Sequence, residues 1–187
     1  MSETIQFYYN PMSRARITHW TLEEIGAPYE INLLDFEKAE HKKPEFLKLN
    51  PMGKVPAIVH RGKVVTEVAA ICAYLGDMFP KTNLAPTIDH PDRAVYLRWM
   101  FFMASNWEAA VMDKLFPRAA PVRASMLGYG SYEDTLNTVE KAILPGPFIL
   151  GDRFTMADLL TAAQLGWNLQ FKSIEPRPAF VEYVERC

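Results

Sequence analysis

The sequence predicts an α/β domain followed by an all-helical domain. Before about residue 80, short β-rich runs alternate with segments in which apolar residues recur every three or four positions. After that point the periodicity is helical alone. Residues 79–91 hold three prolines and no periodic apolar pattern, which is typical of a linker. We therefore expect domains over residues 1–80 and 91–187, joined by a linker over 81–90.

The first domain should begin with a βαβ unit. Ile5–Tyr9 is a short β-rich run that Asn10-Pro11 ends. From Ser13 onward one apolar face recurs at helical spacing, and Gly26-Ala27-Pro28 ends that helix. Alternation resumes over residues 29–33. We expect a second strand there, parallel to the first and reached by a right-handed crossover.

A helix, a hairpin and a further helix should complete this domain. Pro44–Leu49 has the pattern of a short helix, which Asn50-Pro51 ends. Val55–Val59 and Lys63–Thr66 are predicted strands separated by a gap of hairpin size. Glu67–Met78 repeats its apolar residues at helical spacing. The predicted order is βαβ, then α, then ββα.

Helices alone are predicted for the second domain. One should run from about Pro91 to Lys114, and another over Tyr132–Leu144. Thr155 and Asp158 have the spacing of a capping box at the start of a third helix. A role for Asp158 as a catalytic acid is the alternative, but helix capping explains the local pattern better.

Composition and charge exclude several functional classes. Hydrophobic residues make up 49% of the 187 residues and charged residues 22%, an ordinary globular balance. A net charge of -2 with dispersed basic residues predicts binding neither to nucleic acid nor to an acidic membrane. The two cysteines, Cys72 and Cys187, suggest neither a disulfide framework nor a metal site. With no signal-peptide pattern and no long apolar run, the expected compartment is the cytoplasm.

Three blocks carry a resemblance to a known family. They are Asn50–Pro56 (Asn-Pro-Met-Gly-Lys-Val-Pro), Thr66–Ile71 followed by Tyr74-Leu75, and Gly151–Asp158. In this order and spacing they resemble glutathione transferases, and the likeness covers essentially the whole chain. The opening segments, Asn10–Arg16 and Leu22–Glu30, are similar to those of bacterial members.

The resemblance implies a fold, a co-substrate and an assembly. The first domain would be thioredoxin-like and would hold glutathione, and the second would be all-helical. A small apolar electrophile would bind in a cleft between the two, with no metal required. A cytosolic homodimer with a detoxifying role would be usual for the family.

Two residues compete to donate a hydrogen bond to the sulfur of glutathione. Ser13 opens the first helix, and it can serve as a helix cap, as the sulfur donor, or as both. Tyr9 is the alternative, because many family members use a tyrosine at the end of this strand. Tyr8, whose side chain should face the other side of the sheet, is expected in the core. Some bacterial members use a cysteine in this loop, but residues 1–71 contain none.

The remaining glutathione contacts are implied by matching positions. Val55-Pro56 matches the family's cis-proline turn, in which the Val55 main chain pairs with glutathione; an ordinary proline at a strand start is the alternative. Glu67 would face the α-amino group of glutathione. Val68 stands where the family usually has serine, so one hydroxyl contact is missing.

The glycyl carboxylate of glutathione has two candidate partners, His41 and Lys54. The alternative for both is an ordinary solvated surface residue. The same site also suits peroxide reduction or isomerisation, and a non-catalytic binding or assembly module has the same fold. Relatives usually continue beyond a segment like Tyr183–Arg186, so this chain is either naturally short or truncated at Cys187.

Overall fold

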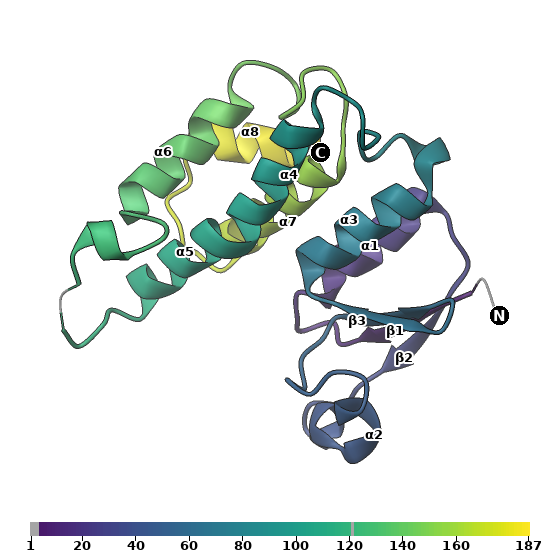
Figure 1. Ribbon diagram of the computed structural model, residues 1–187. Helices are drawn as coiled ribbons and strands as arrows, with labels where there is room; N and C mark the ends of the chain where they lie inside the picture. Colours follow the sequence, from purple (N-terminus) through teal and green to yellow (C-terminus); the bar gives the residue numbers. More distant parts are fainter. Residues whose placement is uncertain (1–3, 121) are drawn as a thin grey trace. The chain divides into compact units, whose positions relative to one another are not determined.

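Two compact units make up the computed structural model, which describes residues 4–120 and 122–187 (Figure 1). The first unit ends at Asn83 and the second begins at Leu84. The boundary therefore lies in the proline-containing segment after the last helix of the α/β unit.

The first unit is built on a four-stranded mixed sheet with the strand order β2-β1-β3-β4. Its strands are β1 (Ile5–Tyr9), β2 (Tyr29–Leu33), β3 (Ala57–His60) and β4 (Lys63–Thr66). β1 pairs parallel with β2 and antiparallel with β3, and β3 pairs antiparallel with β4. This topology confirms the predicted βαβ-α-ββα order of a thioredoxin-like domain.

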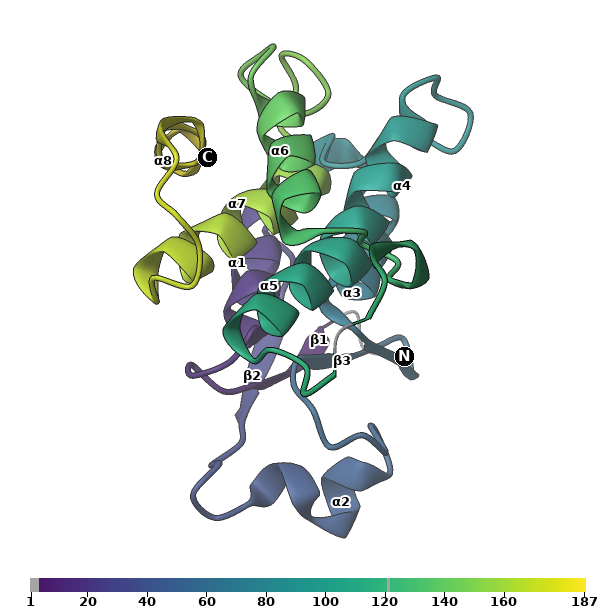
Figure 2. The same cartoon turned by 90° about the vertical axis from the view of Figure 1, so that its left-hand side faces the viewer.

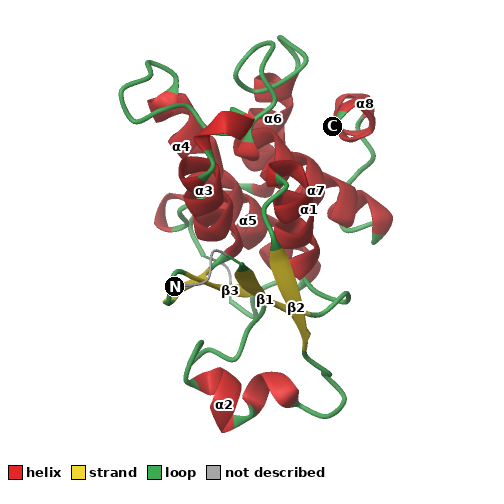
Figure 3. Cartoon of the chain, turned by 90° about the vertical axis from the view of Figure 1, so that its right-hand side faces the viewer, coloured by secondary structure: helices red, strands yellow, loops and turns green. Residues whose placement is uncertain are grey.

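Helices cover the two faces of the sheet unequally. α1 (Ala15–Ile25) and α3 (Val68–Met78) lie together on one face, and α2 (Pro44–Leu47) lies on the other (Figures 1 and 3). Two short 3₁₀ turns, η1 (Glu40–Lys42) and η2 (Pro80–Thr82), complete the unit. Because strand side chains alternate between faces, β1 can pack on both helix layers at once.

Four element boundaries in this unit differ from those predicted. α2 ends at Leu47 rather than at Leu49. β3 begins at Ala57 rather than at Val55, because Pro56 has no N–H to offer a neighbouring strand. α1 begins at Ala15, with Arg14 at the N-cap, and the Ala15 N–H donates to the Ser13 hydroxyl. α3 begins at Val68, because Glu67 has a left-handed φ of 67°.

The second unit contains five helices among the described residues. They are α4 (Arg93–Phe102), α5 (Glu108–Leu115), α6 (Tyr132–Ile143), α7 (Met156–Gln170) and α8 (Pro178–Arg186). A short 3₁₀ turn, η4 (Ala124–Met126), precedes α6. α8 was not predicted, although Pro178 stands at its first position, as is common for helices.

The predicted helix from Pro91 to Lys114 is interrupted. α4 starts at Arg93, and a π-helical turn, η3 (Met103–Trp107), separates it from α5. The three segments still run on as one rod (Figures 1 and 2). Within the wider turn, Asn106 Nδ2 donates to the carbonyl of Gly128 at 2.7 Å and Trp107 Nε1 donates to Asn168 at 2.9 Å.

A buried carboxylate, Asp158, ties the start of α7 to its surroundings. The predicted capping box with Thr155 forms, and Asp158 accepts from the Thr155 N–H at 2.8 Å. It also accepts from the Ile149 N–H and from the Tyr183 hydroxyl, both at 2.7 Å. Because Asp158 is fully buried and its oxygens are occupied, the contacts favour the structural role.

Replacing Asp158 with alanine should lower the free energy of unfolding by about 3 kcal/mol or more, since several buried donors lose their acceptor together. Urea denaturation measures this loss. Asp152→Ala is the matched control, because Asp152 is exposed in the neighbouring loop. A loss below about 1 kcal/mol for Asp158→Ala would contradict the structural role of this carboxylate.

Cys72 lies fully buried in α3, with its sulfur 3.2 Å from Thr21 Oγ1 of α1. Burial raises the pKa of the Cys72 thiol to about 11. The thiolate is the reactive form, so this cysteine should be inert near neutral pH.

In a Cys187→Ser variant, Cys72 should not react with a disulfide reagent at pH ~8 until the protein unfolds, since only roughly one thiol in a thousand is ionised there. Reactivity should rise as the pH approaches 11. Thiol titration with and without urea tests this. Fast stoichiometric labelling of the native protein would show that the thiol is accessible.

Candidate functional site

The turn after β1 places Ser13 at the start of α1. Ser13 is half-buried, and its hydroxyl donates to the carbonyl of Asn10 at 2.7 Å. The same oxygen accepts from the Ala15 N–H at 3.1 Å. The Ser13 hydroxyl thus accepts from the first N–H of α1 and donates its own proton to a neutral carbonyl oxygen.

Asn10 holds this turn from within. Its side chain is only 8% exposed. Oδ1 accepts from the Met12 N–H at 2.8 Å, and Nδ2 donates to the carbonyl of Leu34, just beyond β2, at 2.7 Å. The amide therefore joins the Ser13 turn to the segment that follows the neighbouring strand.

Tyr9 and Tyr8 lie on opposite faces of the sheet, as predicted. The Tyr9 ring lies on the face covered by α1, with its centroid 5.3 Å from that of Phe7 and 5.4 Å from that of His19. Tyr8 lies on the other face, 5.5 Å from the ring of Phe46 in α2. The expectation that Tyr8 is a core residue is wrong: it is half-buried and borders a cavity, because α2 is too short to cover the sheet there.

A second asparagine turn precedes β3. Asn50 is 4% exposed; its Oδ1 accepts from the Met52 N–H at 3.1 Å and its Nδ2 donates to the carbonyl of Lys54 at 2.8 Å. Gly53 adopts a φ of 61°, and a Cβ there would lie 2.7 Å from the carbonyl oxygen of His41. Only glycine fits this contact, so the turn places Lys54 on a segment packed against that of His41.

Packing against Phe36 orients the imidazole ring of His41. The ring lies 4.8 Å from Phe36, and Nδ1 is buried without a hydrogen-bond partner among the described residues. A proton on Nδ1 would be a buried unpaired donor, which is costly. The neutral ring should therefore carry its proton on Nε2. Lys54 is exposed in the neighbouring turn.

The predicted cis bond is present between Val55 and Pro56. Val55 lies just before β3, and among the described residues no main-chain group pairs with its N–H or C=O. Main-chain groups left unpaired next to a sheet strand are a place where a peptide can add as a strand.

The start of α3 combines a strained residue with free amides. Glu67 is exposed, has a φ of 67° and precedes Val68, which opens the helix. A non-glycine residue in this region costs of order 1–3 kcal/mol, and such strain tends to occur at functional sites. The first-turn amides lack helical acceptors, and no side chain in the described ranges caps them. They can bind an anion.

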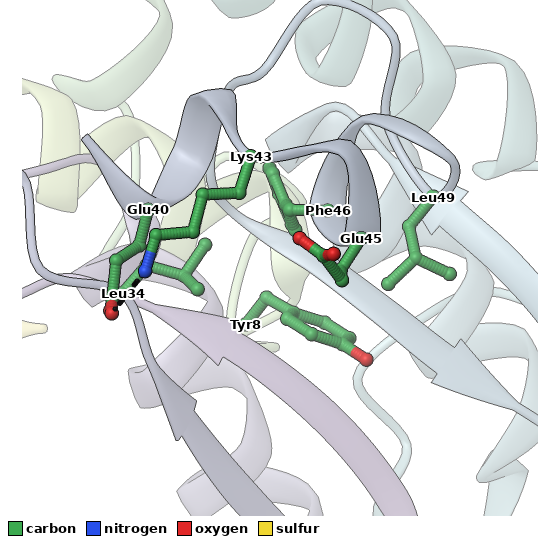
Figure 4. Close-up of a pocket in the computed structure, with 7 residues that line it drawn as sticks. All are labelled: Tyr8, Leu34, Glu40, Lys43, Glu45, Phe46 and Leu49. Carbon is green, nitrogen blue, oxygen red and sulfur yellow. Dashed lines mark hydrogen bonds and ion pairs between the residues drawn. The ribbon is translucent and has the colours of Figure 1, made fainter. Parts of the chain in front are cut away.

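A cavity of about 390 Å³ lies beneath α2 (Figure 4). Tyr8, Leu34, Phe46 and Leu49 form its apolar wall, and Glu40, Lys43 and Glu45 stand at its rim. None of the predicted site residues lines it. Sequence patterns missed this cavity because it forms where a four-residue helix only partly covers the sheet.

The described residues form neither a metal-binding cluster nor a membrane-spanning helix. In residues 4–120 and 122–187, no three His, Cys, Asp or Glu side chains are grouped so that they could share a metal ion. Within the same ranges, no helix has both the length and the apolar character needed to cross a bilayer.

Comparison with known proteins adds independent findings. Residues 3–77 match the family model described as glutathione S-transferase, N-terminal domain. The chain is 26% identical over 184 residues to glutathione S-transferase GstA of Escherichia coli O157:H7, which covers 95% of this chain and 91% of that relative. It is 28% identical over 155 residues to glutathione S-transferase 1 of Schizosaccharomyces pombe, covering 79% of this chain and 66% of the relative's length.

A solved structure matches over nearly the whole chain. A glutathione transferase homolog from Sulfitobacter, with bound glutathione, aligns with a TM-score of 0.77 and 26% identity, covering 99% of this chain and 92% of that one. The mixed sheet and the helical second unit agree with these matches. The chain therefore belongs to the glutathione transferase family.

Proposed function

We propose that this protein is a glutathione transferase that binds glutathione on its first unit and activates it as a thiolate. The observation that carries the proposal is the Val55 main chain, which is left unpaired beside a cis-proline bond and the Asn50 turn. The cysteinyl residue of glutathione can pair with it as one strand pairs with another.

The γ-glutamyl end of glutathione would lie at the start of α3. The Glu67 carboxylate would face its α-amino group, and the first-turn amides would bind its carboxylate. Val68 offers its N–H but no hydroxyl, so the complex lacks one hydrogen bond that serine would supply. A bond of that kind to a charged acceptor is worth roughly 1.5–3 kcal/mol, which predicts modest affinity.

The glycyl carboxylate would bind between His41 and Lys54. The Nε2–H of His41 is the donor that its buried Nδ1 leaves available. The exposed ammonium of Lys54 adds charge from the neighbouring turn. These contacts and those at α3 would fix the two ends of the tripeptide and leave its sulfur near the β1–α1 turn.

Ionising the thiol is the chemical task of the site. A free cysteine thiol has a pKa of about 8.5, and lowering it by two units requires about 2.7 kcal/mol of preferential thiolate binding. When the Ser13 hydroxyl turns from the Asn10 carbonyl to sulfur, it exchanges a neutral hydrogen bond for a charge-assisted one about twice as strong. The N-terminus of α1 contributes further.

The thiolate then attacks the electrophile. A sulfur–carbon bond forms. In a substitution, the leaving group departs with the electron pair of the bond that breaks; in an addition to a double bond, the neighbouring carbon takes up the displaced electron pair. The thiol proton is already lost to solvent, so the protein's task is ionisation and positioning. A small apolar electrophile, a cytosolic homodimer and a detoxifying role complete this proposal, and they rest on family resemblance.

Val68 favours one second candidate, a non-catalytic binding module of the same fold. Without the serine hydroxyl, glutathione would be held less tightly. A protein that only binds partners would not need tight glutathione binding. Such a module would hold glutathione without lowering the pKa of its thiol.

Ser13→Ala should raise the pKa of the bound thiol by about 1–2 units and, by lowering the thiolate fraction, reduce turnover at neutral pH by roughly 3- to 25-fold. Tyr9→Phe should change either quantity little, because the ring that packs on His19 is kept. Ultraviolet difference absorbance of the thiolate as a function of pH measures the shift. A large pKa rise in Tyr9→Phe with little change in Ser13→Ala would make Tyr9 the sulfur donor. If the thiol bound to the wild-type protein has an unshifted pKa, the binding module is favoured.

A further inference from the structure

The first unit contains two Asn-Pro-Met turns with matching hydrogen bonds, at residues 10–12 and 50–52. Each asparagine is nearly buried, with 8% of Asn10 and 4% of Asn50 exposed. In each turn Oδ1 accepts from the methionine N–H two residues later. In each, Nδ2 donates to a main-chain carbonyl.

The two turns differ in what they hold together. Nδ2 of Asn50 reaches Lys54, four residues away in the same turn. Nδ2 of Asn10 instead reaches Leu34, 24 residues away. The carbonyl of Asn10 is also the acceptor that holds the Ser13 hydroxyl, at 2.7 Å. Asn50 thus stabilises only its own turn, whereas Asn10 connects two segments that are far apart in the sequence.

The segment that Asn10 reaches leads directly to His41. Leu34 follows β2, and its N–H donates to the Tyr9 carbonyl at 2.8 Å. The Asp35 N–H then donates to Glu40 Oε2 at 2.9 Å, which closes the segment as a loop before His41. The bond from Asn10 therefore links the turn that carries Ser13 to the loop that carries His41.

We propose that Asn10 is a positioning residue: it fixes the Ser13 hydroxyl relative to the 34–43 loop and thereby sets the acidity of bound glutathione. This inference rests on the proposed function. Asn50, with the same chemistry in the other turn, positions Lys54 and Val55 and so governs how tightly glutathione is held. One side-chain type at two places would control two separate properties of the site.

Asn10→Ala and Asn50→Ala form a matched pair for the test. Asn10→Ala should raise the pKa of the bound thiol by roughly 0.5–1 unit, the equivalent of about one hydrogen bond, with a smaller change in affinity. Asn50→Ala should weaken glutathione binding by about 5-fold or more and leave that pKa in place. Asn10→Ser keeps an acceptor for the Met12 N–H, so the pKa of the bound thiol should lie between those of the wild type and Asn10→Ala.

Calorimetry gives the affinity, and thiolate absorbance gives the pKa. Because the pKa belongs to the complex, a variant that is merely less stable leaves it unchanged. Equal pKa values in wild type and Asn10→Ala would overturn the positioning role, as would the same shift in both alanine variants.

Amide hydrogen exchange without glutathione keeps this inference separate from the proposed function. Asn10→Ala should speed exchange in both 11–14 and 34–43, whereas Asn50→Ala should do so only in 51–54. If exchange in residues 34–43 is not faster in Asn10→Ala, the proposed link between Asn10 and this loop is refuted, even if the protein binds glutathione. If the wild type shows the link but binds no glutathione, the proposed function fails, and with it the role of Asn10 in acidity.

Discussion

The structure depends on one constraint: main-chain polar groups in buried turns must be paired, and few side chains are placed to pair them. Asn10 and Asn50 do this at the two turns of the first unit, and Asp158 does it at the start of α7. Each is nearly or fully buried, so water cannot replace it. The turns at Asn10 and Asn50 can then present Ser13 and Val55 in fixed positions without help from a ligand.

The chemistry of the proposed site follows from what those turns leave unpaired. Main-chain groups at Val55 and the first amides of α3 lack partners among the described residues, and such groups suit a peptide with a free carboxylate. The buried, inert Cys72 keeps the protein's own sulfur out of the reaction. In the proposed site, the acidity of the bound thiol would depend on the Ser13 hydroxyl and the N-terminus of α1, and Val68 would weaken binding at the other end.

Much of the fold could be predicted from the sequence, because alternation and helical spacing are local signals. The strands over residues 5–9, 29–33 and 63–66 lie where they were predicted. The π-helical turn at Met103–Trp107 was not predictable, since it accompanies contacts to residues far along the chain, Gly128 and Asn168. At the candidate site, the cis Val55–Pro56 bond was predictable, from the family resemblance. The Asn10–Leu34 bridge and the exposure of Tyr8 were not, because both depend on how separate segments pack.

Calorimetric titration with glutathione near pH 7, in buffers of different ionisation enthalpy, would show whether the site ionises the thiol that it binds. If binding lowers the pKa of the thiol by two units, to roughly 6.5, about 0.7 proton should be released per bound molecule, because the free thiol is mostly protonated at that pH. S-methylglutathione, which has no thiol proton, should bind with no such release. Binding of glutathione without proton release, or no binding at all, would contradict the account.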